Sequence, residues 1–279
     1  MVRNGGSLPP DITSRKCIRS RHGSGTQKAI GSGLRDYDED INSRPLLANH
    51  LGSNVAIHLH TNGNDFPQPR GVEVVAQPGR PEDARLASAV LCSMQEQVRS
   101  IPSYAAFPFA ARPVFVSKGE NRLARMPSVI VEVAYHSNPD DAAALQDPAF
   151  RSASMKGVEK GYRLFRDGKS CEPFVLQPIP DVSLATGASQ EIALPFAGHP
   201  QFPVTMEFTT ANCSSPGACR PSRTTFDDPN APIAVVMRCA GNLAGTARWS
   251  VVLRDVDGVA TAPVEFQQTC SRPGAPPAA

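Results

Sequence analysis

Hydrophobic periodicity changes along this chain at a proline-rich stretch, residues 171–180. Before that stretch, segments with strand patterns alternate with segments whose apolar residues recur at helical spacing, which favours a sheet covered by helices. After it, apolar residues recur only with the period of two that is typical of strands. The sequence therefore predicts an α/β domain followed by a small all-β sandwich domain.

The boundaries of the two predicted domains follow from this change. At 279 residues the chain is long enough for two domains that each bury their own core. We expect a first domain over residues 1–168, a linker over 169–180, a β-sandwich over 181–271 and a disordered tail over 272–279.

Regular elements of the first domain are predicted from residue 43 onward, whereas residues 1–42 indicate loop with a short strand near Ile12. Ser43 is a suitable N-cap for a short helix that runs through His50 and ends at Gly52. The remaining predicted elements are strands Asn54–His60, Val72–Ala76, Pro113–Ser117 and Val129–Tyr135, helix Glu82–Val98, and a closing helix with Phe150, Val158, Tyr162 and Phe165 on one face.

The last third of the chain is marked by strand patterns around Val204–Phe208, Ala234–Cys239 and Ala247–Leu253. Trp249 alternates with apolar residues on its strand, which indicates a core position rather than a platform for a sugar ring. A sandwich of this kind could bind glycan, anchor an enzyme or hold it away from a surface.

Cysteine usage indicates an oxidising compartment. We expect the four cysteines of the last third to form two disulfides, and these four are Cys213, Cys219, Cys239 and Cys270. Three connectivities are open, although Cys213 and Cys219 enclose a tight loop compatible with a local bond. At least one of Cys17, Cys92 and Cys171 is then free or paired with a group outside this chain.

Charge and hydropathy exclude several classes of protein. The formal net charge is +2 and no dense basic stripe is present, so nucleic acid is not an expected partner. No apolar run approaches the ~20 residues that span a bilayer. The first residues, MVRNGGSLPP, also lack the apolar region of a signal peptide. Because the disulfides call for secretion, we expect the true start, with its signal, to lie upstream of Met1.

Two histidines lie at the carboxyl end of a predicted buried strand. Strand alternation points His58 and His60 to one face of the sheet. Neutral imidazole is the commonest metal ligand in proteins, so these positions suit zinc. The alternative is a pair of hydrogen-bonded histidines at a sheet edge.

A carboxylate interrupts the strongly apolar strand Val129–Tyr135 at Glu132. Burial of an unpaired carboxylate is costly, so Glu132 requires a metal, an arginine or a catalytic proton as partner. A structural ion pair is the alternative. Taken together, the histidines and Glu132 suggest a metal with a nearby general base, as in metal-assisted hydrolysis.

Four segments resemble the zinc-dependent N-acetylmuramoyl-L-alanine amidase family, in the family's order. They are Ser43–Asn49, Ala56–Asn62, Arg70–Val74 and Met126–Pro139. The resemblance covers residues from about Thr13 to Phe165, and it is most specific over Glu132–Asn138. It implies a three-layer α/β/α sheet domain of amidase type that acts on peptidoglycan with Zn²⁺ as cofactor.

The resemblance also implies roles for individual residues. The position of His60 implies a zinc ligand, and that of Glu132 implies the catalytic acid/base that deprotonates zinc-activated water. The family's other ligands, a His and a Glu, lie upstream of the Arg44 segment and have no match; His22 and Glu39 are poorly placed for these roles. We therefore expect a truncated chain that is poorly active, and a parent enzyme located in the periplasm or outside the cell.

Five further residues are expected to contact substrate or to surround the metal ligand: His58, Asn62, Arg70, His136 and Asn138. His58 and His136 stand where the family usually has a small hydroxyl residue and an apolar residue. The alternative function is a non-catalytic cell-wall-binding protein on a degenerate amidase scaffold. The oligomeric state is not predicted.

Overall fold

The computed structural model describes residues 33–214, 219–241 and 243–272. The short strand expected near Ile12 and nearly all of the expected tail lie outside these ranges. The described residues fold as two compact units, one within residues 1–91 and 107–168, the other within residues 92–106 and 169–279. Within the described ranges, no helix has the length and apolar character required to cross a membrane.

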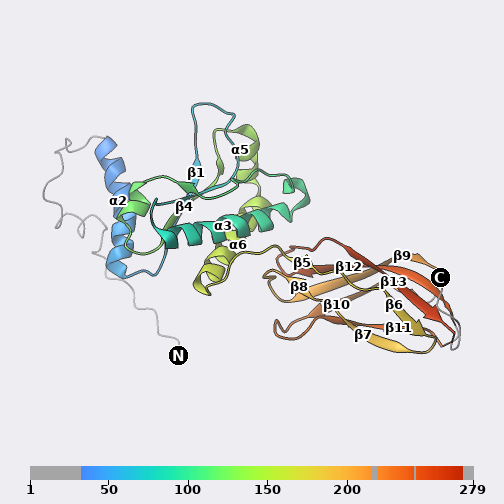
Figure 1. Ribbon diagram of the computed structural model, residues 1–279. Helices are drawn as coiled ribbons and strands as arrows, with labels where there is room; N and C mark the ends of the chain where they lie inside the picture. Colours follow the sequence, from blue (N-terminus) through green and yellow to red (C-terminus); the bar gives the residue numbers. More distant parts are fainter. Residues whose placement is uncertain (1–32, 215–218, 242, 273–279) are drawn as a thin grey trace, which may run out of the picture. The chain divides into compact units, whose positions relative to one another are not determined.

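The first unit contains a mixed four-stranded sheet with the order β1-β4-β2-β3 (Figure 1). Its strands are β1 (Ala56–Asn62), β2 (Glu73–Ala76), β3 (Val114–Phe115) and β4 (Ser128–Tyr135). Strand β1 is parallel to β4 and β3 is parallel to β2, whereas β2 is antiparallel to β4. Strands and helices alternate along this unit, so the predicted α/β fold is confirmed.

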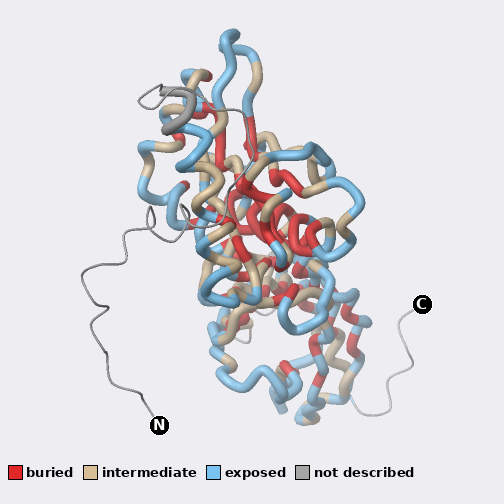
Figure 2. The backbone as a smooth tube through the Cα atoms, turned by 90° about the vertical axis from the view of Figure 1, so that its left-hand side faces the viewer, coloured by how far each residue is buried: buried red, intermediate tan, exposed pale blue. Residues whose placement is uncertain are grey.

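Strand β4 lies inside the sheet and is buried along its whole length except at Glu132, which is half-buried. A strand covered on both faces requires a continuous apolar run, and Val129–Val131 with Val133–Ala134 supply it. Figure 2 shows buried segments gathered at the centre of the unit and exposed residues in its loops. The interior of β4 therefore holds Glu132 in a fixed position.

Helices α3 (Pro81–Arg99) and α6 (Pro148–Arg166) run beside each other in Figure 1. The expected apolar face of α3 is fully buried at Leu86, Val90, Met94 and Val98. A Cβ atom at Gly161 would lie 2.5 Å from the Cα atom of Val90. The absence of a side chain at Gly161 therefore lets the two helix backbones approach closely.

Helix α2 (Gly33–Leu51) begins ten residues before the predicted cap, so both the loop expected over 33–42 and the N-cap at Ser43 are wrong. Ser43 lies inside the helix, where its hydroxyl donates to the carbonyl oxygen of Asp40 at 2.7 Å. The first half of α2 has no apolar periodicity, which is why its sequence suggests loop. The predicted end is correct, because Gly52 follows with a φ of 65°.

The remaining helices of the first unit are short: α4 (Gly119–Leu123) and α5 (Pro139–Gln146). A 3-10 turn, η1 (Pro102–Tyr104), lies in the segment 92–106, which belongs to the second unit. Neither α4 nor α5 was expected from hydrophobic periodicity. Helix α4 carries Glu120, whose side chain is buried.

The second unit is rich in β-structure, as predicted. Its largest sheet has five strands in the order β10-β9-β12-β13-β6, and two-stranded sheets β11-β7 and β5-β8 accompany it. The strands are β5 (Val175–Leu176), β6 (Val182–Ala185), β7 (Ser189–Ala193), β8 (Phe196–Ala197), β9 (Val204–Cys213), β10 (Ser222–Phe226), β11 (Ala234–Arg238), β12 (Gly245–Asp255) and β13 (Val264–Ser271).

Trp249 lies in the core of the second unit, as predicted, with 5% of its surface exposed. Its ring stacks on Phe208 with 4.5 Å between ring centroids, and its indole N–H donates to Gln268. The segment 169–180, expected as a linker, is not all coil. Its residues Phe174 and Leu176 are buried in the same core, and β5 pairs with β8.

Three disulfides are present in the described part of the chain. The bonds Cys213–Cys219 and Cys239–Cys270 confirm the two disulfides expected in the last third. A third bond joins Cys92 on α3 to Cys171, 79 residues later. This pairing was not predicted, because spacing alone does not reveal a partner so far along the chain. Cys17 lies outside the described residues.

Candidate active site

His60 and Glu132 occupy paired positions on the neighbouring parallel strands β1 and β4. Side chains at paired positions of adjacent strands project from the same face of the sheet. Alternation along β1 places His58 on that face as well. The structure thus brings together the two residues on which the expected hydrolytic chemistry depends.

Glu120 completes this group, although no sequence pattern indicated it. Its side chain is 5% exposed, and its Oε1 atom lies 3.1 Å from Nε2 of His60 and 3.6 Å from Nδ1 of His58. Arg44 of α2 donates from Nη1 to the same oxygen at 2.7 Å and lies 3.2 Å from Nε2 of His60. We call His58, His60, Glu120 and Arg44 the histidine–glutamate cluster.

A hydrogen-bond relay fixes the tautomer of His58. The side-chain amide of Asn121 donates to the carbonyl oxygen of Val75, so its Oδ1 atom accepts from the hydroxyl of Ser128 at 2.9 Å. The Ser128 hydroxyl proton is then committed, and its oxygen, 3.3 Å from Nε2 of His58, accepts from that nitrogen. In the neutral form of His58, Nδ1 then carries the lone pair, and this atom lies 3.6 Å from Oε1 of Glu120.

Burial lowers the pKa of His58 below its usual range. The charge of Glu120 opposes this shift, whereas those of His60 and Arg44 add to it. The imidazole is therefore neutral at physiological pH. A neutral imidazole with a free lone pair is the form that binds metals.

Glu132 has the electrostatics of a general base. Burial raises the pKa of its carboxyl, the carboxylates of Glu73 and Glu120 raise it further, and His60 acts in the opposite direction. Its Oε2 atom is buried and has no hydrogen-bond partner among the described residues. A carboxylate in this state takes up a proton more readily than an exposed one.

A second carboxylate lies on the other side of Glu132. Glu73 pairs with it across β2 and β4, and accepts hydrogen bonds from the hydroxyl of Tyr135 at 3.2 Å and the amide of Asn62 at 3.4 Å. Burial, together with the charge of Glu73, raises the pKa of Tyr135 to about 12. Tyr135 therefore remains a hydrogen-bond donor. Asn62, which pairs with Tyr135 in register, is the expected residue closest to this part of the site.

The other expected residues lie at the ends of the strands. His136 follows β4, and its Nδ1 lies 3.1 Å from the hydroxyl of Thr61. Arg70 forms ion pairs with Asp140 at 2.9 Å and Asp141 at 3.4 Å. Asn138 caps helix α5. None of these three contacts the histidine–glutamate cluster through an interaction that the structure records.

Asn138 has a structural explanation. Its Oδ1 atom accepts from the backbone N–H groups of Asp140 and Asp141, and its amide donates to the carbonyl of Pro67 at 2.6 Å. We expect Asn138→Ala to destabilise the protein by about 1–2 kcal/mol in urea unfolding. Asn64→Ala, which removes an exposed contact to the N–H of Phe66, should cost less than about 0.5 kcal/mol. A loss confined to substrate affinity would contradict this role of Asn138.

The cluster contains imidazole nitrogens and a carboxylate oxygen, which are donor types that zinc binds. Two ligands of a tetrahedral zinc ion lie about 3.3 Å apart, and Glu120 lies 3.1 and 3.6 Å from the two imidazole nitrogens. In the described ranges, however, no three His, Cys, Asp or Glu side chains already have the arrangement of a metal site. The guanidinium of Arg44 lies among these donors.

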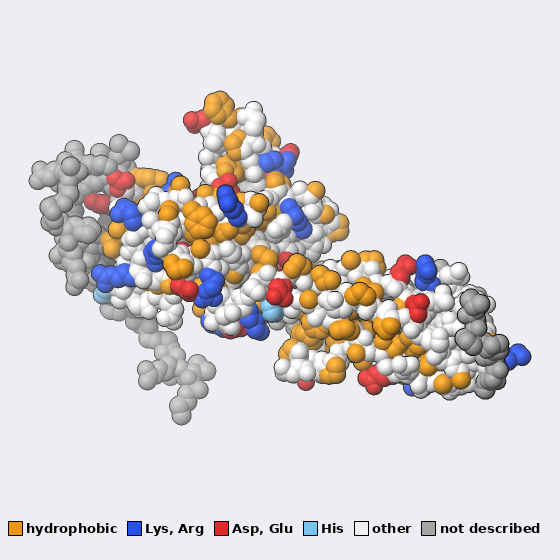
Figure 3. Space-filling model, in the orientation of Figure 1, with side chains coloured by type: hydrophobic (Ala, Val, Ile, Leu, Met, Phe, Trp, Pro, Cys, Tyr) orange, Lys and Arg blue, Asp and Glu red, His pale blue; other side chains and the backbone are white. Residues whose placement is uncertain are grey.

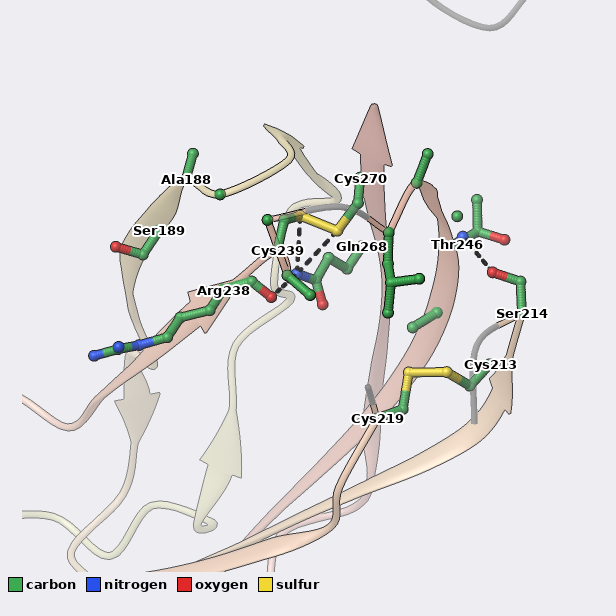
Figure 4. Close-up of a pocket in the computed structure, with 17 residues that line it drawn as sticks. Ala188, Ser189, Cys213, Ser214, Cys219, Arg238, Cys239, Thr246, Gln268 and Cys270 are labelled. Carbon is green, nitrogen blue, oxygen red and sulfur yellow. Dashed lines mark hydrogen bonds between the residues drawn. A yellow bond between two sulfur atoms is a disulfide. The ribbon is translucent and has the colours of Figure 1, made fainter. Parts of the chain in front are cut away.

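The β-rich unit holds a cavity of about 560 Å³, shown in Figure 4. Disulfides Cys213–Cys219 and Cys239–Cys270 line it, with small and hydroxyl residues. Among the described residues that line it, Arg238 is the one with a charged side chain, and none is aromatic. This lining offers neither an acid–base pair nor a ring on which a sugar could stack.

The surface of the molecule carries charges of both signs. Lys and Arg side chains and Asp and Glu side chains are scattered over the face shown in Figure 3.

Comparisons with known proteins agree with the resemblance in the sequence. A family model described as N-acetylmuramoyl-L-alanine amidase matches residues 22–162. No curated protein matches the chain. Solved structures do match, among them the catalytic domain of CwlV, an N-acetylmuramoyl-L-alanine amidase from Bacillus (Paenibacillus) polymyxa var. colistinus, at 22% identity and a TM-score of 0.40.

That match covers 46% of this chain and 66% of the CwlV domain, so the chain spans just under two thirds of that structure. The CwlD amidase from Clostridioides difficile, solved with the GerS lipoprotein, matches at 15% identity with a TM-score of 0.44 and covers 56% of this chain and 82% of that one. Ami1 from Mycobacterium smegmatis matches at 21% identity with a TM-score of 0.39, over 46% and 61% of the two chains.

Proposed function

This chain belongs to the N-acetylmuramoyl-L-alanine amidase family, and from that premise we propose that it hydrolyses the amide bond between N-acetylmuramic acid and L-alanine in peptidoglycan. The observation that carries the proposal is the pairing of His60 with Glu132 across β1 and β4. The imidazole proposed to bind the metal and a carboxylate of raised pKa then project from the same face of the sheet.

Glu132 is proposed as the general base and then the general acid. Zinc, when bound, supplies Lewis acidity that polarises the amide carbonyl and eases deprotonation of water. The partnerless Oε2 atom of Glu132 is available to take the proton of the attacking water. The raised pKa of Glu132 lets it hold that proton and return it to the amine of L-alanine as the amide bond breaks.

His60 is proposed as a zinc ligand, and residues at the ends of β1 and β4 as contacts for the substrate. Asn62 and Tyr135 lie in register there, next to Glu132. Two further residues are proposed as contacts for the peptide. They are His136, which follows β4, and Arg70, which precedes β2 and has a 40% exposed side chain. His58 is proposed to line the same site. Asn138 is proposed to orient this region by capping α5.

The two domains expected from the sequence are proposed to have different roles. Residues 1–168 are proposed as the catalytic domain and residues 181–271 as an accessory domain. The three disulfides support a location in the periplasm or outside the cell, where peptidoglycan is accessible.

The proposal is tested by incubating the protein and zinc with purified sacculi. We expect slow release of stem peptides whose new amino terminus is L-alanine, with glycan strands left intact. New reducing sugar ends, or new D-amino acid termini, would contradict the proposed bond.

The second candidate function is that of a non-catalytic wall-binding protein. The observation that favours it is the guanidinium of Arg44, which lies among the potential metal ligands. Sedimentation with sacculi without peptide release would identify that function.

A further inference from the structure

A loop beside the proposed active site exposes a large aromatic side chain. We call residues 63–70 the Phe66 loop; in it, Phe66 has 69% of its surface exposed. The loop follows β1 directly, and Figure 1 shows it standing out from the sheet beside α5. Because β1 and β4 are parallel, the loop starts at the edge of the sheet where β4 also ends. Ligands of α/β sheets bind outside the carboxyl ends of the strands.

Hydrogen bonds fix the Phe66 loop to the residues that follow β4. The N–H of Asn64 donates to the hydroxyl oxygen of Ser137 at 3.0 Å. The side-chain amide of Asn138 donates to the carbonyl oxygen of Pro67 at 2.6 Å. Between these two anchors, the N–H of Phe66 donates to Oδ1 of Asn64 at 3.0 Å. The backbone is therefore held on both sides of Phe66.

Steric restriction adds to these anchors. Pro67 and Pro69 each have a backbone φ angle fixed by the ring. A Cβ atom at Gly63 would lie 2.8 Å from the ring of His136, so this ring packs directly against the loop backbone. A single exposed apolar side chain requires no function. An aromatic ring held on a restricted backbone at the end of a proposed active-site strand, however, is a preformed binding group that loses little entropy when a ligand binds.

Polar side chains flank Phe66 along the loop. Asn64, Asp65 and Gln68 are exposed. Among the described residues, no partner is recorded for Nδ2 of Asn64, the carboxylate of Asp65 or the side chain of Gln68. Amide and carboxylate groups of this kind form hydrogen bonds with hydroxyl and acetamido groups. The loop thus presents an apolar ring with a polar rim, the combination that orients small polar ligands.

A pyranose ring matches this surface. One face of the sugar consists of C–H groups and is flat enough to lie on a phenyl ring, while its edges carry hydroxyl and acetamido groups. The peptide arm of the proposed substrate begins with L-alanine, whose methyl group is too small to cover a phenyl ring. The chemistry of Phe66 and its rim therefore favours the glycan over the peptide.

The position of the loop indicates which sugar it meets. Strand β4 continues in extended conformation from Glu132 to Tyr135, so its end lies about 10 Å beyond Glu132 at the strand rise of ~3.3 Å per residue. The loop is anchored to Ser137 and Asn138, which come after that end. A ring on Phe66 is thus displaced from the bond that Glu132 is proposed to cleave.

We propose that Phe66 is a stacking platform for a sugar ring of the glycan strand that neighbours the N-acetylmuramic acid whose amide is cut, with Asn64, Asp65 and Gln68 as its hydrogen-bonding rim. The inference rests on the function proposed above and names the part of the substrate that this region selects. Because Phe66 contacts the substrate away from the reacting atoms, it contributes to affinity and to the preference for polymeric substrate, not to the chemical step.

The first test measures binding without turnover. The full chain with Glu132→Gln is titrated calorimetrically with a β-1,4-linked tetramer of N-acetylglucosamine. Adding Phe66→Ala should weaken binding by about tenfold, because the stacked ring is lost. Phe66→Trp should bind at least as tightly as the Phe66 protein, whereas Phe66→Leu, which is apolar but not flat, should resemble Phe66→Ala. Phe115→Ala is the matched control: Phe115 is 49% exposed and lies on β3 at the opposite edge of the same sheet, so its loss should leave binding unchanged.

The second test separates affinity from chemistry in the protein that retains Glu132. Its substrates are soluble glycan–peptide fragments with one or with several disaccharide units. For the longer fragments, Phe66→Ala should raise KM by about tenfold and leave kcat close to wild type. For the single unit, which has no neighbouring disaccharide, both constants should be unchanged. Circular dichroism of each variant establishes that it is folded.

Two results would overturn the inference: unchanged affinity for the tetramer in Phe66→Ala, or Phe66→Leu that binds as tightly as the Phe66 protein. Sedimentation with phosphatidylglycerol vesicles that depends on Phe66, without binding of the tetramer, would also overturn it. Binding of the tetramer that depends on Phe66, in a protein that releases no peptide from sacculi, would support this inference while contradicting the proposed hydrolysis. Peptide release with a tetramer affinity that is indifferent to Phe66 would do the reverse, so the two failures are distinguishable.

Discussion

Glu132→Gln should reduce the release of L-alanine-terminated peptides from sacculi by about 10²–10⁴-fold, the range typical of a lost general acid–base catalyst. The glutamine side chain has nearly the shape of the glutamate but cannot take up the proton of water. Because Glu132 is not among the proposed metal ligands, the affinity for Zn²⁺ should change little. The measurement is a rate of peptide release beside a calorimetric zinc titration.

The pH dependence of peptide release by the wild-type protein also tests Glu132 as the general base. Burial raises the pKa of Glu132, so the acidic limb of the pH–rate profile should lie above the ordinary range of a glutamate. A carboxyl whose folded pKa is raised contributes stability at low pH, and this stability is lost as pH rises through the folded pKa. Ionised Glu132 therefore costs stability at neutral pH, and Glu132→Gln should be at least as stable as wild type there.

Glu73→Gln is the matched control for this prediction. Glu73 pairs with Glu132 across the sheet but accepts hydrogen bonds from Tyr135 and Asn62, so it acts on the reaction through its neighbours. Its replacement should lower activity much less than Glu132→Gln does. Equal peptide release by wild type and Glu132→Gln would remove the catalytic assignment of Glu132.

The sequence predicted the part of the fold that periodicity determines. Strands β1, β2 and β4 and helix α3 were placed within about two residues, because each has a regular apolar pattern and a turn at its end. Helix α2 was not, because tertiary contacts stabilise it. Asn49 donates to the carbonyl of Leu123 and accepts from the N–H of Arg125, both more than 70 residues away. No local pattern contains such contacts.

Some residues of the candidate site were likewise predictable from the sequence, and others were not. His60 and Glu132 were predictable because each is a polar residue at a position where a buried strand requires an apolar one. Glu120 lies in the polar run Lys118–Asn121, where a carboxylate is unremarkable in sequence. Its partners His60 and Arg44 are 60 and 76 residues away, so its burial and its charge environment depend on the folded sheet.

Removal of the Cys92–Cys171 disulfide should be the most destabilising of the three possible disulfide deletions. The bond closes a loop with a sequence separation of 79, against 31 for Cys239–Cys270 and 6 for Cys213–Cys219. The chain-entropy relation gives losses of about 4.5, 3.7 and 2.2 kcal/mol for these three loops. Double cysteine-to-serine variants, unfolded in urea without reductant, measure the free energy of unfolding in each case.

The order of the three losses is more informative than their size, because each disulfide deletion also introduces two hydroxyl groups. All variants should carry Cys17→Ser so that no spare thiol exchanges with the remaining bonds. The short Cys213–Cys219 loop is the internal control, since its closure restricts the unfolded chain least. Equal losses for the longest and the shortest loop would show that restriction of the unfolded chain does not determine the ranking. A loss for Cys92→Ser/Cys171→Ser that clearly exceeds the other two would establish that, of the three disulfides, the bond between α3 and Cys171 contributes most to the free energy of unfolding.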